Sequence, residues 1–173
     1  KLNIGSITEV KGQIADVIDF EEKGGKLMRL TEVIDSLSPL SSVVVLAGDD
    51  PSLQYREVKS LIEEIKDKKI ILETSSFNRD LHHICDKVVF IFKTYDMVHE
   101  NVIQHINNHL DKYVPVAIGD HENFNAENFA MLCKILDVLY VRIPEGGKSN
   151  LIEMSQIAER YETKLIEMDK IPL

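Results

Sequence analysis

The sequence predicts an α/β fold built on a parallel sheet, and three observations lead to this prediction. Short apolar runs alternate with amphipathic stretches along all 173 residues. Several runs, among them residues 43–46 and 88–92, are apolar at every position, which is typical of parallel strands covered on both faces. The stretches between the runs repeat apolar residues at spacings of three and four, as amphipathic helices do. Alternating strands and helices of this kind indicate right-handed β-α-β units.

The predicted elements follow one another closely along the chain. Seven strands are expected, at residues 15–20, 42–47, 69–74, 87–92, 114–118, 139–143 and 164–168. Five helices are expected between them, at residues 27–37, 56–66, 98–110, 126–136 and 151–161, with a shorter one after Asn78. Asn125 and Asn150 are suitable N-caps for the last two helices. Seven strands cannot close an eight-stranded barrel, so an open, partial (β/α) barrel and a flat doubly wound sheet both fit the pattern.

The bulk composition predicts a single domain covering residues 1–173. No apolar run approaches the roughly 18 residues that span a bilayer, and the first residues show no signal-peptide pattern. The only two cysteines, Cys85 and Cys133, lie far apart in the sequence, which fits a reducing cytoplasm better than a disulfide scaffold. A net charge of -9 without a basic cluster argues against a nucleic-acid partner.

Polar residues follow four of the predicted strands, at the edge where parallel sheets and barrels bind ligands. These four segments begin at Gly48, Glu73, Lys93 and Gly119. Two interpretations remain open. The segments are ordinary solvated loops, or they form an acidic site that binds Mg²⁺ or acts as acid and base. The carboxylates of such a site would be Asp49, Asp50, Glu73 and Asp120.

One of these strand ends resembles a cofactor loop of the radical S-adenosylmethionine (radical SAM) enzymes. The segment Val45-Leu46-Ala47-Gly48-Asp49-Asp50-Pro51 is similar to the family's glycine-glycine-glutamate-proline strand end. In that family the backbone of this loop holds the amino group of S-adenosylmethionine. Here Asp49 replaces the second glycine, and Asp50 replaces the glutamate but keeps a carboxylate. Asp49 therefore adds a side chain where backbone must come close to ligand.

Two further segments fit the same resemblance, and their order and spacing agree with the glycyl-radical-activating branch of the family. Leu72-Glu73-Thr74-Ser75 is similar to the start of a leucine-glutamate-threonine-asparagine-glycine segment. Phe90-Ile91-Phe92-Lys93 is similar to a strand that ends in aspartate-x-lysine, with Ile91 in the place of the aspartate. The resemblance implies that the cofactor pocket is lined by Gly48, Asp49, Asp50, Glu73, Ser75 and Lys93.

The cysteine motif that binds the iron–sulfur cluster of that family is absent from this sequence. Residues 4–20 resemble the start of such an enzyme, where a CxxxCxxC loop should follow, but residues 21–26 read Glu-Glu-Lys-Gly-Gly-Lys. A four-iron cluster of this kind needs three thiolates from one chain, and this chain has only two cysteines. We therefore expect no iron–sulfur cluster, and no residues are predicted to bind a metal.

A short cluster of His82, His83 and Cys85 is the main alternative metal site. Neighbouring residues of a helix point about 100° apart, so His82 and His83 rarely share one ion. We interpret this segment as a surface helix with Cys85 turned toward the core.

Three hypotheses about function follow. The favoured one is a pseudoenzyme, a radical-SAM-like protein with a TIM-barrel-like partial barrel that binds a small ligand or a protein partner without catalysis. The resemblance alone implies that it is accessory to a metal-cofactor or anaerobic enzyme system, with S-adenosylmethionine as the candidate ligand. The second is an enzyme that uses the acidic strand-end site. The third is a binding module whose protein partner covers the barrel mouth or the open edge, with neither nucleic acid nor membrane as partner.

Overall fold

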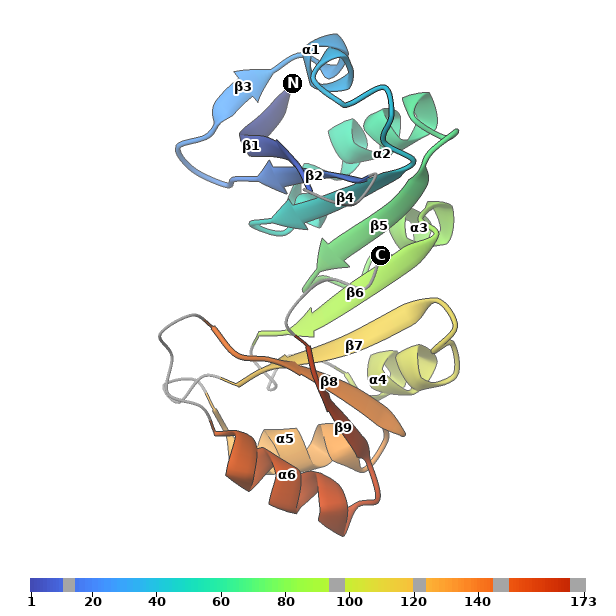
Figure 1. Ribbon diagram of the computed structural model, residues 1–173. Helices are drawn as coiled ribbons and strands as arrows, with labels where there is room; N and C mark the ends of the chain where they lie inside the picture. The colour runs from blue at the N-terminus through green and yellow to red at the C-terminus, as the bar shows by residue number, and fades with distance from the viewer. Residues whose placement is uncertain (11–14, 94–98, 120–123, 145–149, 169–173) are drawn as a thin grey trace. The chain divides into compact units, whose positions relative to one another are not determined.

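A computed structural model of the chain describes residues 1–10, 15–93, 99–119, 124–144 and 150–168. Nine strands form a mostly parallel sheet in the order β3-β1-β2-β4-β5-β6-β7-β8-β9 (Figure 1). The strands are β1 (Leu2–Glu9), β2 (Ala15–Phe20), β3 (Lys26–Met28), β4 (Val43–Gly48), β5 (Lys69–Thr74), β6 (Lys87–Phe92), β7 (Tyr113–Ile118), β8 (Val138–Arg142) and β9 (Lys164–Glu167). The predicted α/β class with a parallel sheet is confirmed.

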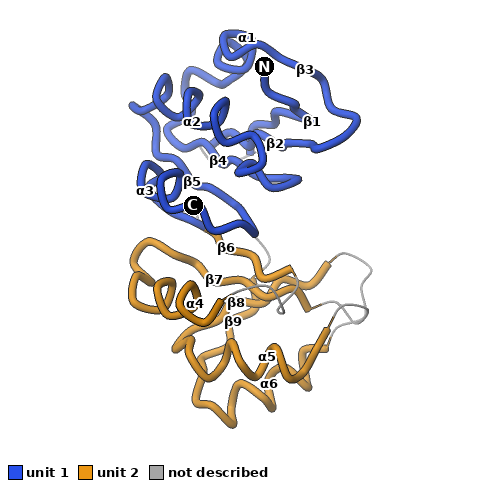
Figure 2. Tube along the Cα trace, turned by 180° about the vertical axis from the view of Figure 1, so that it is seen from behind, with its two compact units in different colours: residues 1–88, 173 blue, residues 89–172 orange. Residues whose placement is uncertain are grey.

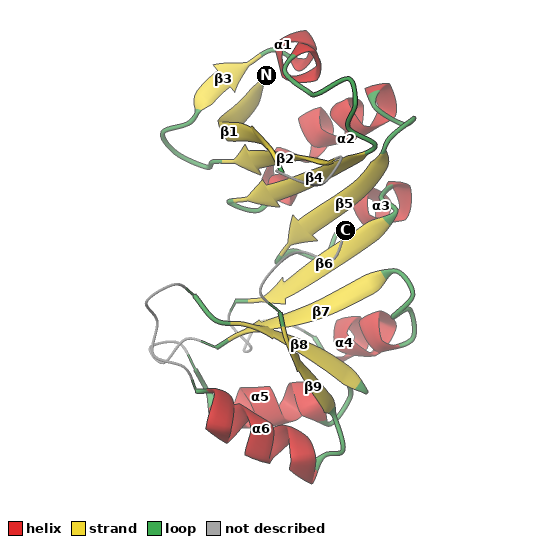
Figure 3. Cartoon of the chain, in the orientation of Figure 1, coloured by secondary structure: helices red, strands yellow, loops and turns green. Residues whose placement is uncertain are grey.

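The helices alternate with the parallel strands, as Figure 3 shows. They are α1 (Leu30–Asp35), η1 (Pro51–Gln54, a 3-10 helix), α2 (Tyr55–Glu64), α3 (Arg79–Ile84), α4 (Glu100–Asn107), α5 (Ala126–Cys133) and α6 (Leu151–Arg160). The side chains of Asn78 and Asn125 cap α3 and α5 by accepting backbone N–H bonds from Leu81 and Asn128. None of the helices in the described ranges has the length and apolar character needed to cross a bilayer.

The chain divides into two compact units, residues 1–88 and residues 89–172 (Figure 2). In the first unit, β2, β4 and β5 run parallel and α1, α2 and α3 lie along one face of the strands (Figure 1). Fully buried aliphatic side chains of this unit include Ile18, Leu46 and Leu72. In the second unit, β7, β8 and β9 are parallel neighbours, and α5 packs beside α6.

Two strands near the N-terminus were not predicted, and both are antiparallel. β1 pairs with β2 on one side and with β3 on the other, so that Asn3 lies opposite Leu27. The predicted helix 27–37 was wrong at its start, because residues 26–28 form β3 and α1 begins only at Leu30. The apolar spacing from Leu27 onward is helical, but Leu27 itself is 62% exposed and its backbone pairs with β1 instead.

Candidate functional site

In the first unit, the segment that follows β4 is joined to the end of β5 and to the residues after it by several hydrogen bonds. Gly48 closes β4, and the chain then passes through Asp49 and Asp50 into η1. The end of β5 lies against η1, because the Ser52 and Thr74 hydroxyl oxygens are 2.9 Å apart. Both segments thus meet at the carboxyl edge of the sheet, where β-α-β proteins bind ligands.

Asp50 is buried where these segments meet and is 6% exposed. Its carboxylate accepts hydrogen bonds from the hydroxyls of Thr74 (2.7 Å), Ser75 (2.9 Å) and Ser76 (2.7 Å). The backbone N–H groups of Ser52 (3.1 Å) and Ser75 (3.2 Å) also donate to it. Asp50 therefore ties the end of β4 to the end of β5 with both oxygens engaged by its own chain.

The charge state of Asp50 follows from these contacts. Burial is the largest single influence and raises its pKa, but the hydrogen bonds from Ser76, Thr74, Ser75 and Ser52 together outweigh it. The net result is a pKa below the ordinary value, because each donor favours the ionised form. Asp50 is a buried anion that neutral donors stabilise, which suits it to hold the loop.

Gly48 brings this loop close to the end of β2. Its φ of 96° lies in the region that favours glycine, and a β-carbon there would lie 2.3 Å from both the Phe20 carbonyl oxygen and Asp19 Oδ1. The next residue, Asp49, donates its N–H to the Phe20 carbonyl at 2.7 Å. The Asp49 carboxylate accepts the N–H of Glu22 at 3.3 Å. The loop is thereby fixed over β2, with the exposed side chain of Asp49 at its outer edge.

A row of side chains crosses the three parallel strands on the face opposite the helices. Asp19 of β2 pairs with Ala47 of β4. On the next strand, Leu72 of β5 pairs with Leu46 of β4, and Glu73 is the residue that follows Leu72. Side chains alternate between the two faces of a strand, so Asp19 points away from Asp16, which accepts the Ser38 N–H after α1 at 2.9 Å. Strands two positions apart are separated by roughly 10 Å, and the small Ala47 side chain lies between the two acidic residues.

We call Asp19, Asp49 and Glu73 the acidic row. Burial raises the pKa of Asp19, and the negative charges of Asp49 and then Glu73 raise it further. Asp19 was not predicted as a site residue, because it falls inside a predicted strand. The available signal was its position one residue before the end of a parallel strand, where alternation turns it to the face opposite Asp16.

The structure brings most of the predicted site residues together and leaves one in the other unit. Gly48, Asp49, Asp50 and Glu73 lie at the strand ends of the first unit, and half-buried Ser75 belongs to the hydrogen-bonded shell of Asp50. Lys93 is exposed directly after β6 in the second unit. The fourth acidic residue of the alternative site, Asp120, lies outside the described residues.

The histidine–cysteine cluster does not behave as predicted in one respect. Cys85 is buried, as expected, but His82 is also buried, at 1% exposure, and not on the surface. Its ring packs edge-on against Phe77, with ring centroids 5.3 Å apart. Edge-to-face packing of this kind is a favourable arrangement for a buried aromatic ring. Within the described ranges, no group of three or more His, Cys, Asp or Glu residues is arranged to hold a metal ion.

The residues present do not fit an iron–sulfur cluster. Cys85 and Cys133 are both buried and belong to different units, and no third thiolate exists in the sequence. Burial raises the pKa of the Cys133 thiol to about 11, which disfavours the thiolate that metal binding requires.

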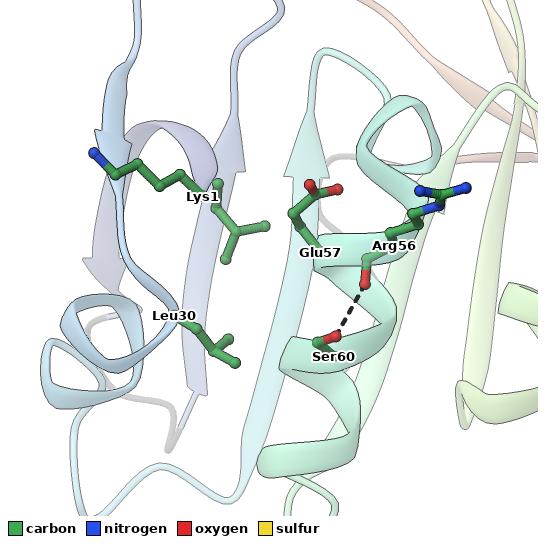
Figure 4. Close-up of a pocket in the computed structure, with 6 residues that line it drawn as sticks. Lys1, Leu30, Arg56, Glu57 and Ser60 are labelled. Atoms are coloured by element: carbon green, nitrogen blue, oxygen red, sulfur yellow. Dashed lines mark hydrogen bonds between the residues drawn. The ribbon is translucent and has the colours of Figure 1, made fainter.

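A pocket of about 270 Å³ lies elsewhere in the first unit, on the helix side (Figure 4). Figure 4 shows Lys1 and Leu30 on one side and Arg56, Glu57 and Ser60 of α2 on the other. The Ser60 hydroxyl donates to the Arg56 carbonyl at 3.1 Å, so it is engaged within the helix. None of the predicted site residues lines this pocket.

No protein-family model matches this chain, and the search for similar curated proteins found no match.

Replacing Asp19 with asparagine is expected to stabilise the fold at neutral pH, by less than about 1 kcal/mol for a partly exposed charge. A raised pKa means that the ionised carboxylate is less favourable in the folded chain than in the unfolded chain. The gain should therefore be absent below the unfolded-state pKa and complete above the folded-state pKa. Urea denaturation of both proteins from acidic to neutral pH measures it, and a gain that persists unchanged in acid would contradict the assignment.

Proposed function

We propose that this chain is a non-catalytic, radical-SAM-like protein that binds a small cationic ligand at the acidic row. The single observation that carries the proposal is the convergence of Asp19, Asp49 and Glu73 on one strand-end edge of the first unit. The finer fold that goes with this proposal is the partial (β/α) barrel that the strand-end motifs imply. Its context would be a metal-cofactor or anaerobic enzyme system, and no iron–sulfur cluster takes part.

The ligand is expected to carry an amino group or another positive charge. Burial is the largest cause of the raised pKa of Asp19, and repulsion from the negative charges of Asp49 and Glu73 adds to it. A cation between them would relieve that repulsion, and a charge pair 4 Å apart near a protein surface is worth about 4 kcal/mol before desolvation. S-adenosylmethionine meets this requirement, because it carries an ammonium and a sulfonium group.

The acidic row supplies the carboxylates that Asp50 no longer offers. In the radical SAM resemblance, Asp50 stands in the place of a glutamate, but all of its hydrogen bonds described above go to its own loops. A ligand ammonium would instead meet Asp19, Asp49 or Glu73. Asp50 then acts by fixing the loop that carries Asp49.

A second candidate function is favoured by the raised pKa of Asp19. A carboxyl group whose pKa is raised gives up its proton less readily than an ordinary one, which is the direction that a general acid needs. In that case the strand-end site would be an enzyme active site, with Asp19 as the proton donor. The two candidates differ in their response to neutralisation of Asp19, because amide replacement abolishes proton donation but leaves part of the cation site intact.

The proposal predicts that S-adenosylmethionine raises the melting temperature of the metal-free full chain. A ligand at about 100 times its dissociation constant adds roughly 2.7 kcal/mol, which means several degrees for a domain of this size. S-adenosylhomocysteine, which lacks the sulfonium charge, should give a smaller shift. Asp19→Asn and Glu73→Gln should each reduce the shift.

The matched control is Glu64→Gln, an exposed residue at the end of α2 that lies outside the acidic row. It removes the same charge and should leave the shift unchanged. Absence of any shift with the wild-type chain would exclude S-adenosylmethionine as the ligand. A shift that Asp19→Asn and Glu73→Gln leave intact would exclude the acidic row as its site. If S-adenosylmethionine causes no shift, we would propose instead that a protein partner binds at the barrel mouth or the open edge.

A further inference from the structure

An open groove of about 470 Å³ runs between α5 and α6 in the second unit. The two helices lie side by side in both Figure 1 and Figure 2. The groove lining includes the small side chains of Ala126 and Ala130 from α5 and the apolar side chain of Ile157 from α6. Tyr161 closes one end, where the Lys134 ammonium lies 5.7 Å from its ring centroid.

Both helices present charges to this groove in the same order and at the same spacing. An acidic residue in the first turn is followed three positions later by an uncharged residue, and four positions after that by a basic one. Residues three and seven apart share one face of a helix, and seven residues span about 10 Å along its axis. The two sets are Glu127 and Ala130 in α5 with its C-cap Lys134, and Glu153, Gln156 and Arg160 in α6.

The first turn of α6 also carries the most exposed large apolar residue of the second unit among those described. Ile152 of α6 is 79% exposed. It stands four positions before Gln156, so the two side chains lie in one row of the helix. The groove thus combines an apolar floor, an apolar side chain at its margin and a charge pattern that is negative at one end and positive at the other.

We propose that this groove is the interface of a homodimer formed with a second copy of this chain. A two-fold axis that lies in the interface and crosses both helices places α5 on α5 and α6 on α6, each pair antiparallel. Glu127 then faces Lys134 of the second copy, and Glu153 faces Arg160 of the second copy. The same symmetry sets Ile152 opposite Tyr161 of the second copy, and the two grooves together form the core of a four-helix arrangement.

The charges select this orientation over the other face-to-face arrangement. A two-fold axis parallel to the helices would bring acidic ends against acidic ends and basic ends against basic ends, which is destabilising. In the antiparallel arrangement every charge of the two sets has one partner of opposite sign, and each kind of pair occurs twice because of the two-fold symmetry. Four groove charges of each sign, two from each chain, are paired across such an interface.

Sedimentation equilibrium of the full chain tests this inference. The wild-type chain is expected to dimerise reversibly, and added salt should weaken the dimer. Arg160→Glu and Glu153→Lys should each weaken association about tenfold or more, since each substitution breaks two symmetry-related pairs. A mixture of these two variants should associate better than either alone, because every pair across the interface is again of opposite charge.

Two further variants separate the interface from effects on folding. Ile152→Ser should weaken the dimer without lowering the melting temperature of the monomer, because the side chain is exposed in the single chain. Glu63→Lys, the same charge change on an exposed position of α2 in the first unit, should leave association unchanged. The inference is overturned by a wild-type chain that stays monomeric at every concentration, or by a mixture of Arg160→Glu and Glu153→Lys that associates no better than its components.

Discussion

Replacing Gly48 with alanine is expected to lower the free energy of unfolding by more than about 3 kcal/mol. Two separate effects add at this position. The φ of 96° is unfavourable for any residue with a β-carbon, and that β-carbon would lie 2.3 Å from the Phe20 carbonyl oxygen. The clash is with the backbone of β2, which pairs with β4 through Phe20 and Gly48, so relief requires breaking the parallel ladder at the strand ends.

Two other glycines separate these effects and serve as controls. Gly24 has almost the same φ, 97°, but the nearest atom to its β-carbon is a Glu21 side-chain oxygen at 3.5 Å. Gly24→Ala should therefore show the conformational cost alone, about 1–2 kcal/mol. At Gly5 the close atoms all belong to the flexible Glu21 side chain, so Gly5→Ala should cost less than about 1 kcal/mol.

Urea denaturation of the three variants gives the test, and the expected order of destabilisation is Gly48 first, Gly24 second and Gly5 last. A loss at Gly48 no greater than that at Gly24 would mean that the loop does not press on β2 as described. Such a result would also contradict the close approach of the loop to Asp19, because a β-carbon at position 48 would lie 2.3 Å from Asp19 Oδ1. In that case the residues of the acidic row would not lie as close together as described above.

The parallel core of the fold was predictable because its strands carry uninterrupted apolar sequence. All seven predicted strands are present, with ends that shift by one residue at most, and residues such as Val45, Ile71 and Val89 are fully buried. Continuous burial on both faces is the condition that produces such runs. Local sequence was therefore sufficient for these strands.

The strands β1 and β3 were missed for the converse reason. β1 alternates only at its start and then exposes Gly5, Ser6, Thr8 and Glu9, so no apolar run marks it. β3 has three residues and continues a helical spacing. Both are held by pairing with strands distant in the sequence, which is a tertiary effect that local patterns do not encode.

The location of the candidate site was predictable, but the separate roles of its carboxylates were not. The sequence located Asp49, Asp50 and Glu73 at strand ends, but it could not tell which carboxylate turns inward. That depends on the left-handed conformation of Asp50, with φ 42°, which points its side chain at the loop after β5. Asp19 was missed because it lies inside a predicted strand and because the charges near it, Asp49 after β4 and Glu73 of β5, are distant in the sequence.

Replacing Asp50 with alanine is expected to lower the free energy of unfolding by about 3–4 kcal/mol. The variant removes the Asp50 acceptor from the Thr74, Ser75 and Ser76 hydroxyls and from two backbone N–H groups, at a place where Thr74 is buried and the two serines are half-buried. Buried donors without a partner each carry a desolvation penalty. Alanine also tolerates the left-handed conformation less well than aspartate does.

Asp50→Asn and Asp49→Ala provide the matched comparisons. Asparagine keeps one acceptor oxygen and tolerates the same conformation, so we expect a loss of about 1–2 kcal/mol. Asp49 is the adjacent carboxylate, but it is exposed and accepts a single bond of 3.3 Å from Glu22, so Asp49→Ala should cost less than about 1 kcal/mol. Equal losses at the two positions would show that the hydroxyl shell does not depend on Asp50.

The pH dependence of the Asp50→Asn difference identifies the charge as the cause. Because the pKa of Asp50 is lowered in the folded chain, the ionised carboxylate adds stability that is fully present above the unfolded-state pKa. This stability is lost as the pH falls through the folded-state pKa, where the protonated side chain resembles asparagine. The wild-type and Asp50→Asn chains should therefore converge in stability in acid and diverge toward neutral pH. A difference that does not change with pH would assign the effect to packing and leave the buried anion without a role in joining β4 to β5.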